Sequence, residues 1–297
     1  MIHAVQREGT ARTRDGRTLA FIERGPADGV PVIACHGTPG SRRARHPDPE
    51  IYGRHGVRVA VYDRPGYGLS DPKLGRAVVD AAADIEAIAD ELGFDRFVVM
   101  GGSGGAPHAL ACGALLGDRV LRVGALVTPA PPDAEDFDFF EGLADLNVKE
   151  FGAAMEGRAA IEAYLQPLVD QVRREPQTVL DEISSELPEV DRALVSREAF
   201  RTVLLESFEE AVRQGVRGWA DDDLAFAKPW GFELEDVQAE VRLWQGELDV
   251  LAPRSHGEYV AAHLPNAQFE LLEGGGHFLD EEWAVVFDWL AAGARVA

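Results

Sequence analysis

The chain has 297 residues and a formal net charge of −22, with 51 Asp and Glu residues against 29 Lys and Arg residues. Binding to nucleic acids or to anionic membrane surfaces needs clustered cations, so we expect neither as a partner. Apolar residues make up 46% of the chain, no stretch approaches a membrane span, and the first residues lack the apolar run of a signal peptide. We therefore expect a cytoplasmic globular protein, with Cys35 and Cys112 as buried free thiols.

The predicted elements alternate between strands and helices along the first 130 residues or so. A β-hairpin comes first, with strands near residues 3–13 and 18–24. Short, β-branched and nearly apolar runs then predict parallel strands covered on both faces. These runs cover residues 31–35, 57–62, 97–100 and 123–128. A helix is predicted from residue 78 to Leu92, with Gly93 as its stop, and the alternation predicts an α/β sheet.

The pattern changes after the proline-rich residues 129–132 and becomes purely helical for about 100 residues. Strand patterns return at residues 241–244 and 269–272, and a closing helix is predicted over residues 281–292. We therefore predict an α/β core made of residues 1–132 and 233–297, interrupted by a helical insertion of residues 133–232. This insertion carries 23 acidic against 10 basic residues, which we interpret as a solvated acidic surface.

A serine flanked by glycines marks the predicted turn between the strand at 97–100 and the next helix. Residues 101–105 read Gly-Gly-Ser-Gly-Gly, which fits the G-x-S-x-G nucleophile elbow. Glycines allow the tight turn, and the helix N-terminus behind the serine favours developing negative charge. Ser103 is therefore the candidate nucleophile, and a phosphate-binding or purely structural turn is the alternative. A dinucleotide fingerprint is not satisfied, because Pro107 stands where glycine is required.

A serine hydroxyl needs a base that a third group holds in place. His277 lies in a glycine-rich loop after the last predicted strand, and Asp249 follows the strand before it. Both, like Ser103, fall past the carboxyl ends of strands, where open α/β sheets bind ligands. We predict His277 as the base and Asp249 as its orienting acid. Glu247 remains an alternative acid, and a turn-capping loop histidine is the alternative interpretation of His277.

A developing oxyanion needs preorganised N–H donors. The N–H of Gly104, directly after the serine, is one candidate. Residues 36–40, which read His-Gly-Thr-Pro-Gly, follow an early strand and offer the N–H of Thr38 as the second. We expect substrate to bind near His36 and Gly37 and under residues 133–232. The alternative for residues 36–40 is a structural turn with a buried histidine.

Taken together, these motifs resemble the α/β-hydrolase superfamily along the whole chain. Residues 36–40 look like its HG-x-PG oxyanion loop, and residues 63–70 look like its structural D-x-x-G-x-G-x-S loop. The resemblance implies an α/β-hydrolase fold, with a mostly parallel eight-stranded sheet, a helical cap at residues 133–232 and a triad of Ser103, Asp249 and His277. The serine argues against the dehalogenase and epoxide-hydrolase branches, which carry aspartate at the elbow. Proline iminopeptidase-like enzymes share the Gly-Gly-Ser core but usually carry tryptophan where this chain has Gly104.

These inferences predict a cofactor-free serine hydrolase that acts on a small, partly apolar ester or lactone. Amide hydrolysis, carbon–carbon cleavage and acyl transfer use the same groups and stay open, and a non-catalytic ligand receptor is the alternative of a different class. No metal site is expected, because His36, His46 and His55 lack ligand-like spacing, and His108 is expected to pack under the loops. One or two aromatic residues of the insertion are expected to touch substrate and the others to form core. The candidates are Phe139, Phe140, Phe151, Trp219, Phe226, Trp230 and Phe232.

Overall fold

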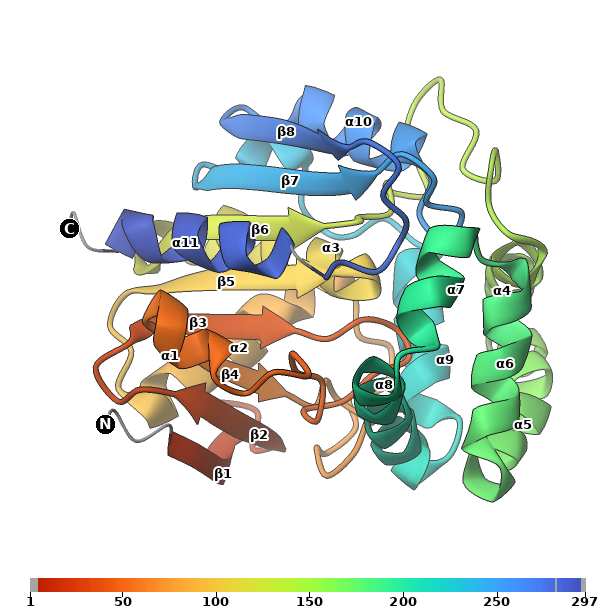
Figure 1. Ribbon diagram of the computed structural model, residues 1–297, viewed down its shortest axis with the longest axis horizontal. Coiled ribbons are helices and arrows are strands. Elements are labelled where there is room, and N and C mark those ends of the chain that lie inside the picture. Colours follow the sequence, from red (N-terminus) through yellow and green to blue (C-terminus); the bar gives the residue numbers. More distant parts are fainter. Residues whose placement is uncertain (1–4, 281, 295–297) are drawn as a thin grey trace.

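The computed structural model describes residues 5–280 and 282–294, which form a central eight-stranded sheet (Figure 1). The strands lie in the order β1-β2-β4-β3-β5-β6-β7-β8. β2 pairs antiparallel with β1 and with β4, and the other neighbours pair in parallel. The predicted mostly parallel α/β sheet is therefore confirmed. The strands are β1 (Val5–Arg12), β2 (Thr18–Gly25), β3 (Val30–Cys35), β4 (Val57–Tyr62), β5 (Phe97–Gly102), β6 (Val120–Leu126), β7 (Glu240–Gly246) and β8 (Ala267–Leu272).

The predicted strand at residues 123–128 is displaced in the structure. β6 begins at Val120, three residues before the predicted start. Arg122 interrupts the apolar run in the sequence, and in the sheet its side chain pairs with Glu240 of the neighbouring β7 at 2.8 Å. β6 ends at Leu126, because Val127 turns into the left-handed region at φ 45°. The predicted residues 3, 4 and 281 lie outside the described part of the chain.

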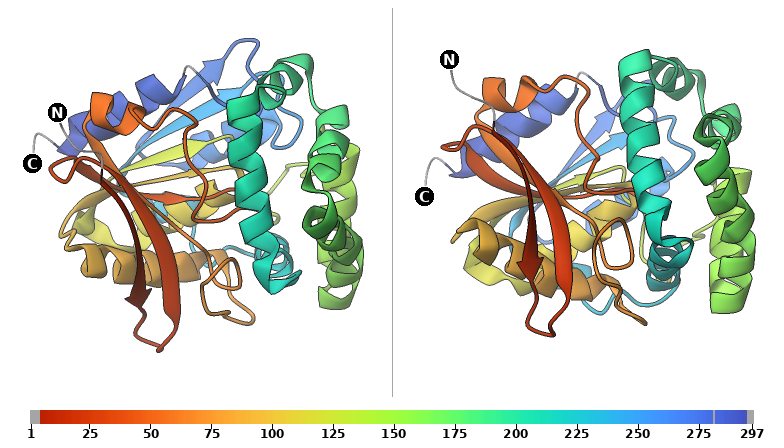
Figure 2. Two further views of the ribbon diagram at one scale, coloured as in Figure 1. Left: turned by 60° about the horizontal axis from the view of Figure 1, so that its bottom comes forward. Right: turned by 90° about the horizontal axis from the view of Figure 1, so that it is seen from below.

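Helices cover both faces of the sheet (Figure 2). One face packs against α2 (Ala81–Leu92), α3 (Ala106–Leu115) and α10 (Arg254–His263), and the other against α1 (Ile51–His55) and α11 (Glu282–Ala294). A single 3₁₀ turn, η1 (Val78–Asp80), leads into α2, so the helix predicted from residue 78 has two parts. No described helix combines the length and apolar character that a bilayer crossing needs.

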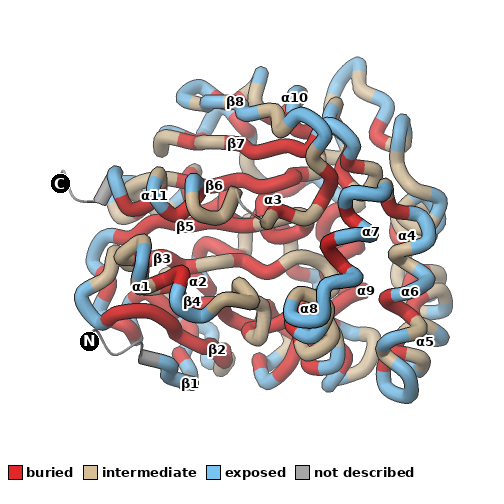
Figure 3. Tube along the Cα trace, in the orientation of Figure 1, coloured by how far each residue is buried: buried red, intermediate tan, exposed pale blue. Residues whose placement is uncertain are grey.

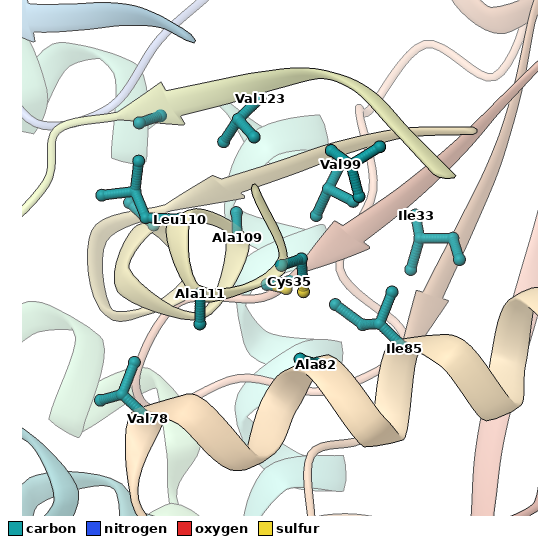
Figure 4. Close-up of a cluster of buried hydrophobic side chains, with 14 of the residues drawn as sticks. Ile33, Cys35, Val78, Ala82, Ile85, Val99, Ala109, Leu110, Ala111 and Val123 are labelled. Atoms are coloured by element: carbon teal, nitrogen blue, oxygen red, sulfur yellow. The ribbon is translucent and has the colours of Figure 1, made fainter. Parts of the chain in front are cut away.

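The central strands are buried along most of their length (Figure 3), as expected for a sheet sandwiched between helices. Figure 4 shows part of this core, where Ile33 and Val99 of the sheet face Ala82 and Ile85 of α2. Packing on both faces fixes the positions of the strand ends, and those ends carry the candidate site.

Six helices of the helical insertion, residues 133–232, lie beyond the carboxyl ends of β3, β5, β6 and β7 (Figure 1). They are α4 (Asp145–Glu156), α5 (Arg158–Arg174), α6 (Pro176–Glu186), α7 (Glu189–Val195), α8 (Glu198–Ala211) and α9 (Arg217–Phe226). One short 3₁₀ turn, η4 (Val212–Gln214), also belongs to the insertion. Three others lie outside it, at η2 (Ser103–Gly105), η3 (Gly117–Arg119) and η5 (Leu234–Asp236). The insertion has apolar clusters of its own, and every residue of α9 from Gly218 to Phe226 is buried.

The predicted solvated acidic surface is wrong for several residues of the insertion. Five of its carboxylates are buried, and most of them face arginine side chains or backbone N–H groups. They are Asp191, Glu210, Asp221, Asp222 and Asp223.

Candidate active site

Ser103 lies at the sharp turn between β5 and α3. Its φ of 53° is in the left-handed region, which costs a non-glycine residue about 1–3 kcal/mol. A Cβ on Gly101 would overlap the carbonyl of Gly105, and a Cβ on Gly105 would overlap the carbonyl of Cys35. The flanking glycines therefore let the start of the helix pack directly on the sheet, with Ser103 held in a strained turn.

His277 and Asp249 are in direct contact. The Nδ1 atom of His277 lies 3.0 Å from Oδ1 and 2.9 Å from Oδ2 of Asp249. A carboxylate only accepts hydrogen bonds, so Nδ1 carries the proton and Nε2 is left as the basic nitrogen. Oδ1 of Asp249 also accepts from the N–H groups of Leu251 at 2.8 Å and Ala252 at 3.0 Å, which fixes the carboxylate.

Glu247, the alternative acid, does not contact His277. It lies at the surface, and its carboxylate accepts a hydrogen bond from the N–H of Gly274 at 2.8 Å. The structure therefore places Asp249, and not Glu247, beside the imidazole.

The surroundings of His277 make it a stronger base. Burial by itself lowers the pKa of the imidazole, but the charge of Asp249, the hydrogen bond to it and the charge of Asp191 together raise the pKa above its ordinary value. Neutral His277 accepts a proton well, and the imidazolium that results is stabilised by Asp249.

Ser103 and His277 line one cavity of about 340 Å³. Within residues 5–280 and 282–294 no hydrogen bond joins the two side chains, as is common before a substrate is bound. The insertion supplies much of the apolar wall. Its aromatic residues there are Phe151, Phe200, Phe208, Trp219 and Phe226, three of which belong to the predicted set of seven.

Thr38 and Gly104 lie side by side in the wall of this cavity. A Cβ on Gly104 would lie 2.9 Å from Cβ of Thr38 and 3.0 Å from Cζ of Phe226, so a side chain at this position has no room. A tryptophan side chain would therefore not fit at this position unless Thr38 or Phe226 moved. His36 and Gly37 line the same cavity.

His36 is a buried structural residue as well as a cavity wall. Its Nε2 accepts from the N–H of Arg64 at 3.2 Å, so its Nδ1 donates to the carbonyl of Gly37 at 2.7 Å. Burial and the nearby Arg64 charge hold the pKa of His36 well below its ordinary value, so the ring is neutral. The alternative of a buried histidine in a turn therefore describes His36 itself.

A buried ionic network, which the sequence analysis did not predict, joins the insertion to this loop. Asp222 of α9 lies 2.5 Å from Nη2 of Arg64 and 2.5 Å from Nη2 of Arg76. Its Oδ2 also accepts from Thr38 Oγ1 and from the Tyr67 hydroxyl, each at 2.8 Å. The helical insertion therefore contacts the same residue whose N–H is the candidate oxyanion donor.

Two further carboxyl groups, Glu150 of α4 and Asp223 of α9, line the cavity. Trp219 Nε1 donates to Glu150 at 2.6 Å, whereas Oδ2 of Asp223 has no hydrogen-bond partner in the described part of the chain. Burial and the neighbouring carboxyl groups raise the pKa of Asp223 well above its ordinary value, and burial raises that of Glu150. The pair therefore keeps a proton to a higher pH than a separate Asp and Glu would.

Two further histidines lie near the cavity. His108 is buried, its Nδ1 lies 2.8 Å from the carbonyl of Gly104, and burial lowers its pKa to about 3. His46 lines the cavity, and its Nδ1 accepts from the N–H of Asp48 at 3.0 Å. Among the described residues, no group of three or more His, Cys, Asp or Glu side chains has the arrangement of a metal site.

Comparisons with known proteins identify the fold family of the chain. The family model described as "alpha/beta hydrolase fold" matches residues 30–282. Proline iminopeptidase of Xanthomonas citri is 36% identical over 111 residues, which are 35% of this chain and only 34% of that protein.

Other similarities extend over nearly the whole chain. A 2-hydroxy-6-oxononadienedioate/2-hydroxy-6-oxononatrienedioate hydrolase of Cupriavidus pinatubonensis is 25% identical and covers 97% of this chain and 96% of that protein. The solved structure of a thermophilic esterase from Thermogutta terrifontis superposes with a TM-score of 0.64 at 22% identity, over 98% of this chain and 96% of that one. At this identity the structural match shows the fold alone.

Proposed function

Because the chain belongs to the α/β-hydrolase fold family, we propose that it is a cofactor-independent serine hydrolase that cleaves a small, partly apolar ester or lactone. The observation that carries the proposal is the contact of His277 Nδ1 with Asp249 at 2.9 Å, in a cavity that Ser103 also lines. A nucleophile, a base and a group that orients the base are the parts that acyl transfer needs. The hydrolases among its relatives support the same class of reaction.

The proposed reaction has two halves. Ser103 Oγ attacks the substrate carbonyl while its proton passes to Nε2 of His277, and the N–H groups of Thr38 and Gly104 stabilise the oxyanion. The bond to the leaving oxygen then breaks as His277 gives it the proton. A water molecule next attacks the acyl-enzyme, gives a proton to His277, and releases the acid as that proton returns to Ser103. Asp249 stabilises the imidazolium in both halves.

The cavity supports a substrate of limited size. Its volume of about 340 Å³ lies at the lower end of the range for small-molecule sites, and the insertion lines it with aromatic side chains. A polymer would need an open groove, whereas the described helices α4–α9 lie over the strand ends. We therefore propose a small molecule with an apolar acyl or alcohol part as the substrate.

The test is hydrolysis of a panel of short-chain 4-nitrophenyl esters and small lactones. Wild type is expected to turn over at least one of them, and Ser103→Ala is expected to lose at least about 10³-fold in kcat. Ser196→Ala removes an exposed serine hydroxyl on the insertion and serves as the matched control, with an unchanged rate. Turnover that survives Ser103→Ala would contradict the proposed mechanism.

The carboxyl pair supports a second candidate function, the hydrolysis of an amide or ester that carries a protonated amine. Four buried charged groups, Asp222, Asp223, Arg64 and Arg76, lie together with the partly buried Glu150. This set has three acids and two bases, so one positive charge is missing when all of them are ionised. The shared proton of the pair supplies that charge, and an ammonium group beside the unpartnered Oδ2 of Asp223 can replace it.

Matched substrates distinguish this candidate. An amino-acid 4-nitroanilide or ester is compared with its deaminated analogue, in wild type and in Asp223→Asn. If the candidate is right, wild type has a lower KM for the amine-bearing substrate than for its deaminated analogue. In Asp223→Asn the two KM values are expected to be equal. Equal kcat/KM for both substrates in wild type would exclude it and leave the simple ester or lactone.

Carbon–carbon cleavage is the other open activity, supported by the relative that is 25% identical over nearly the whole chain. It uses the same Ser103 and His277. A diketone-type dienoate substrate included in the panel separates it from ester hydrolysis by the product that accumulates.

A further inference from the structure

The helical insertion reaches the loop that carries His277 through one buried carboxylate. We call residues 273–280 the His277 loop. Asp191, on α7, has 0% of its surface exposed, and its two oxygens accept hydrogen bonds from consecutive backbone N–H groups of this loop. Oδ2 accepts from His277 and Oδ1 from Phe278, each at 2.9 Å.

The approach of this carboxylate depends on a glycine. A Cβ on Gly276 would overlap the carboxyl group of Asp191, so another residue there would push the two segments apart. A second glycine, Gly246 at the end of β7, lets the loop pack closely on the sheet, because a Cβ there would overlap the carbonyl of Gly276. At these two glycines the His277 loop therefore packs directly against the end of β7 and against Asp191 of α7.

Two weaker contacts continue the same interface. The ring of Phe278 packs edge-on against Phe200 of α8, with centroids 5.6 Å apart. Arg197, just before α8, pairs with Asp280. Three successive parts of the loop thus contact the insertion, and Asp191 is the buried one that touches the histidine's own backbone.

A second effect of Asp191 is electrostatic. Asp249 lies on the imidazole side of His277 and Asp191 on its backbone side, so the residue sits between two carboxylates. The ionisable groups that bear on His277 come from these two elements, the loop after β7 and α7. On the same surface Arg197 pairs with Asp280, while Arg192 of α7 donates to the carbonyl of Leu187.

We propose that Asp191 is a positioning residue for His277, so that the insertion helps to build the catalytic site as well as covering it. This inference rests on the proposed function above. The carboxylate fixes the backbone of the loop, and through it the direction of Nε2 toward Ser103. Its charge favours the imidazolium that forms during the reaction.

Asp191→Asn tests the proposal, because asparagine has nearly the same shape but only one oxygen that can accept. One N–H of the loop then faces an NH₂ group, and the negative charge is lost. Misplacing a reacting group by about 1 Å can cost 10²-fold, so kcat is expected to fall about 10–10²-fold with KM nearly unchanged. The acidic limb of the kcat/KM profile is expected to move to lower pH, which a purely structural role would not cause.

Glu189→Gln is the matched control. Glu189 lies on the same helix, two residues away and exposed, so its substitution removes the same charge without touching the loop. Its rate and pH profile are expected to remain those of wild type. Gly276→Ala disturbs the same contact from the loop side. The added methyl group displaces the Asp191 carboxylate from the loop without removing its charge, so kcat is expected to fall.

Failure of this inference is distinguishable from failure of the proposed function. Titration of the His277 ring by NMR reports the charge of Asp191 even if no substrate is turned over, and a lower ring pKa in folded Asp191→Asn is the expected result. A folded Asp191→Asn variant with wild-type kcat and an unshifted ring pKa would overturn the proposal. If Asp191→Asn does not fold, Gly276→Ala decides, since a wild-type kcat in that variant would equally overturn it.

Discussion

Asp222 of α9 and Arg64 of the loop after β4 form an ion pair that is almost completely removed from solvent, with Oδ2 and Nη2 2.5 Å apart. The guanidinium also donates to the carbonyls of His36 and Gly37 and to the hydroxyl of Thr38. Arg64 of the α/β core and Asp222 of the insertion thus form an ion pair that also contacts Thr38, the proposed oxyanion donor. The geometry of that donor depends on the insertion being docked.

Removing the anion leaves two arginines without their partner. Asp222→Ala is expected to lower the free energy of unfolding by about 3–5 kcal/mol, because Arg64 and Arg76 would stay buried as uncompensated charges. Urea unfolding followed by circular dichroism measures this change. Asp181→Ala is the control, since its pair with Arg201 is exposed and its loss is expected to cost less than about 1 kcal/mol. A loss of the same small size in both variants would contradict the account.

The same pair predicts a pH dependence of stability. Burial alone would raise the pKa of Asp222, but Arg64 and Arg76 hold it well below its ordinary value. A carboxyl group with a depressed pKa in the folded state stabilises the fold above its unfolded pKa, and this contribution is lost as the pH falls further. The difference in Tm between wild type and Asp222→Ala is therefore expected to be constant above about pH 5 and to shrink below pH 4.

Asp249→Asn is expected to remove most of the activity without unfolding the protein. The amide can place the wrong group toward Nδ1 of His277, so the tautomer is no longer fixed and kcat is expected to fall about 10³–10⁴-fold. Since the carboxylate raises the pKa of His277, the acidic limb of kcat/KM lies above the ordinary histidine value in wild type and moves to lower pH in the variant. Glu247→Gln is the control, with wild-type rates at every pH.

Gly104→Ala tests the crowding at the proposed oxyanion site. The added methyl group would lie 2.9 Å from Thr38 Cβ and 3.0 Å from Phe226 Cζ, so one of the two must move. Either movement shifts the N–H of Thr38 or of Gly104 away from the oxyanion, which is expected to lower kcat about 10²-fold. Gly152→Ala, in α4, is the control, because a Cβ there meets nothing within 4 Å and alanine favours the helix. Equal activity of the two variants would argue against Thr38 as a donor.

Asp223→Asn is expected to raise Tm at neutral pH. Burial and the charges of Glu150 and Asp222 raise the pKa of Asp223, with Arg76 opposing them, so the folded protein binds a proton more tightly than the unfolded chain. Stability then falls as the pH rises above the ordinary carboxyl pKa. Asparagine does not ionise, so the variant does not lose stability in this way. The Tm of Asp223→Asn minus that of wild type is therefore expected to grow from about pH 4 upward. Glu150→Gln is expected to show the same pH dependence. A Tm difference from wild type that shrinks as the pH rises would contradict the idea that the two carboxyl groups share a proton.

Strands that are apolar because both of their faces are buried could be predicted from the sequence. Residues 57–62 form β4 as predicted, because the apolar run is bounded by Gly56 and Asp63. Ser103, Asp249 and His277 could be placed for a related reason. Each lies within five residues of the carboxyl end of a strand, and β5, β7 and β8 run in the same direction, so the three residues fall at one edge of the sheet.

The residues that join the insertion to the core could not be predicted. Asp191 is 86 positions from His277 and binds backbone N–H groups, which every residue has and which therefore leave no sequence pattern. Residues 221–223 look like a solvated acidic run. Successive residues of a helix point about 100° apart, and each of the three meets a different partner environment. Asp221 pairs with Arg158, Asp222 with Arg64, and Asp223 lies beside Glu150.

The most direct test of the central claim, that Ser103 is a nucleophile activated by His277, is intact-mass labelling with a fluorophosphonate. Wild type is expected to gain one adduct per chain, Ser103→Ala none, and His277→Ala the same adduct at a rate lower by several orders of magnitude. An adduct that persists in Ser103→Ala, or folded wild type that neither labels nor hydrolyses any small ester, would contradict the account.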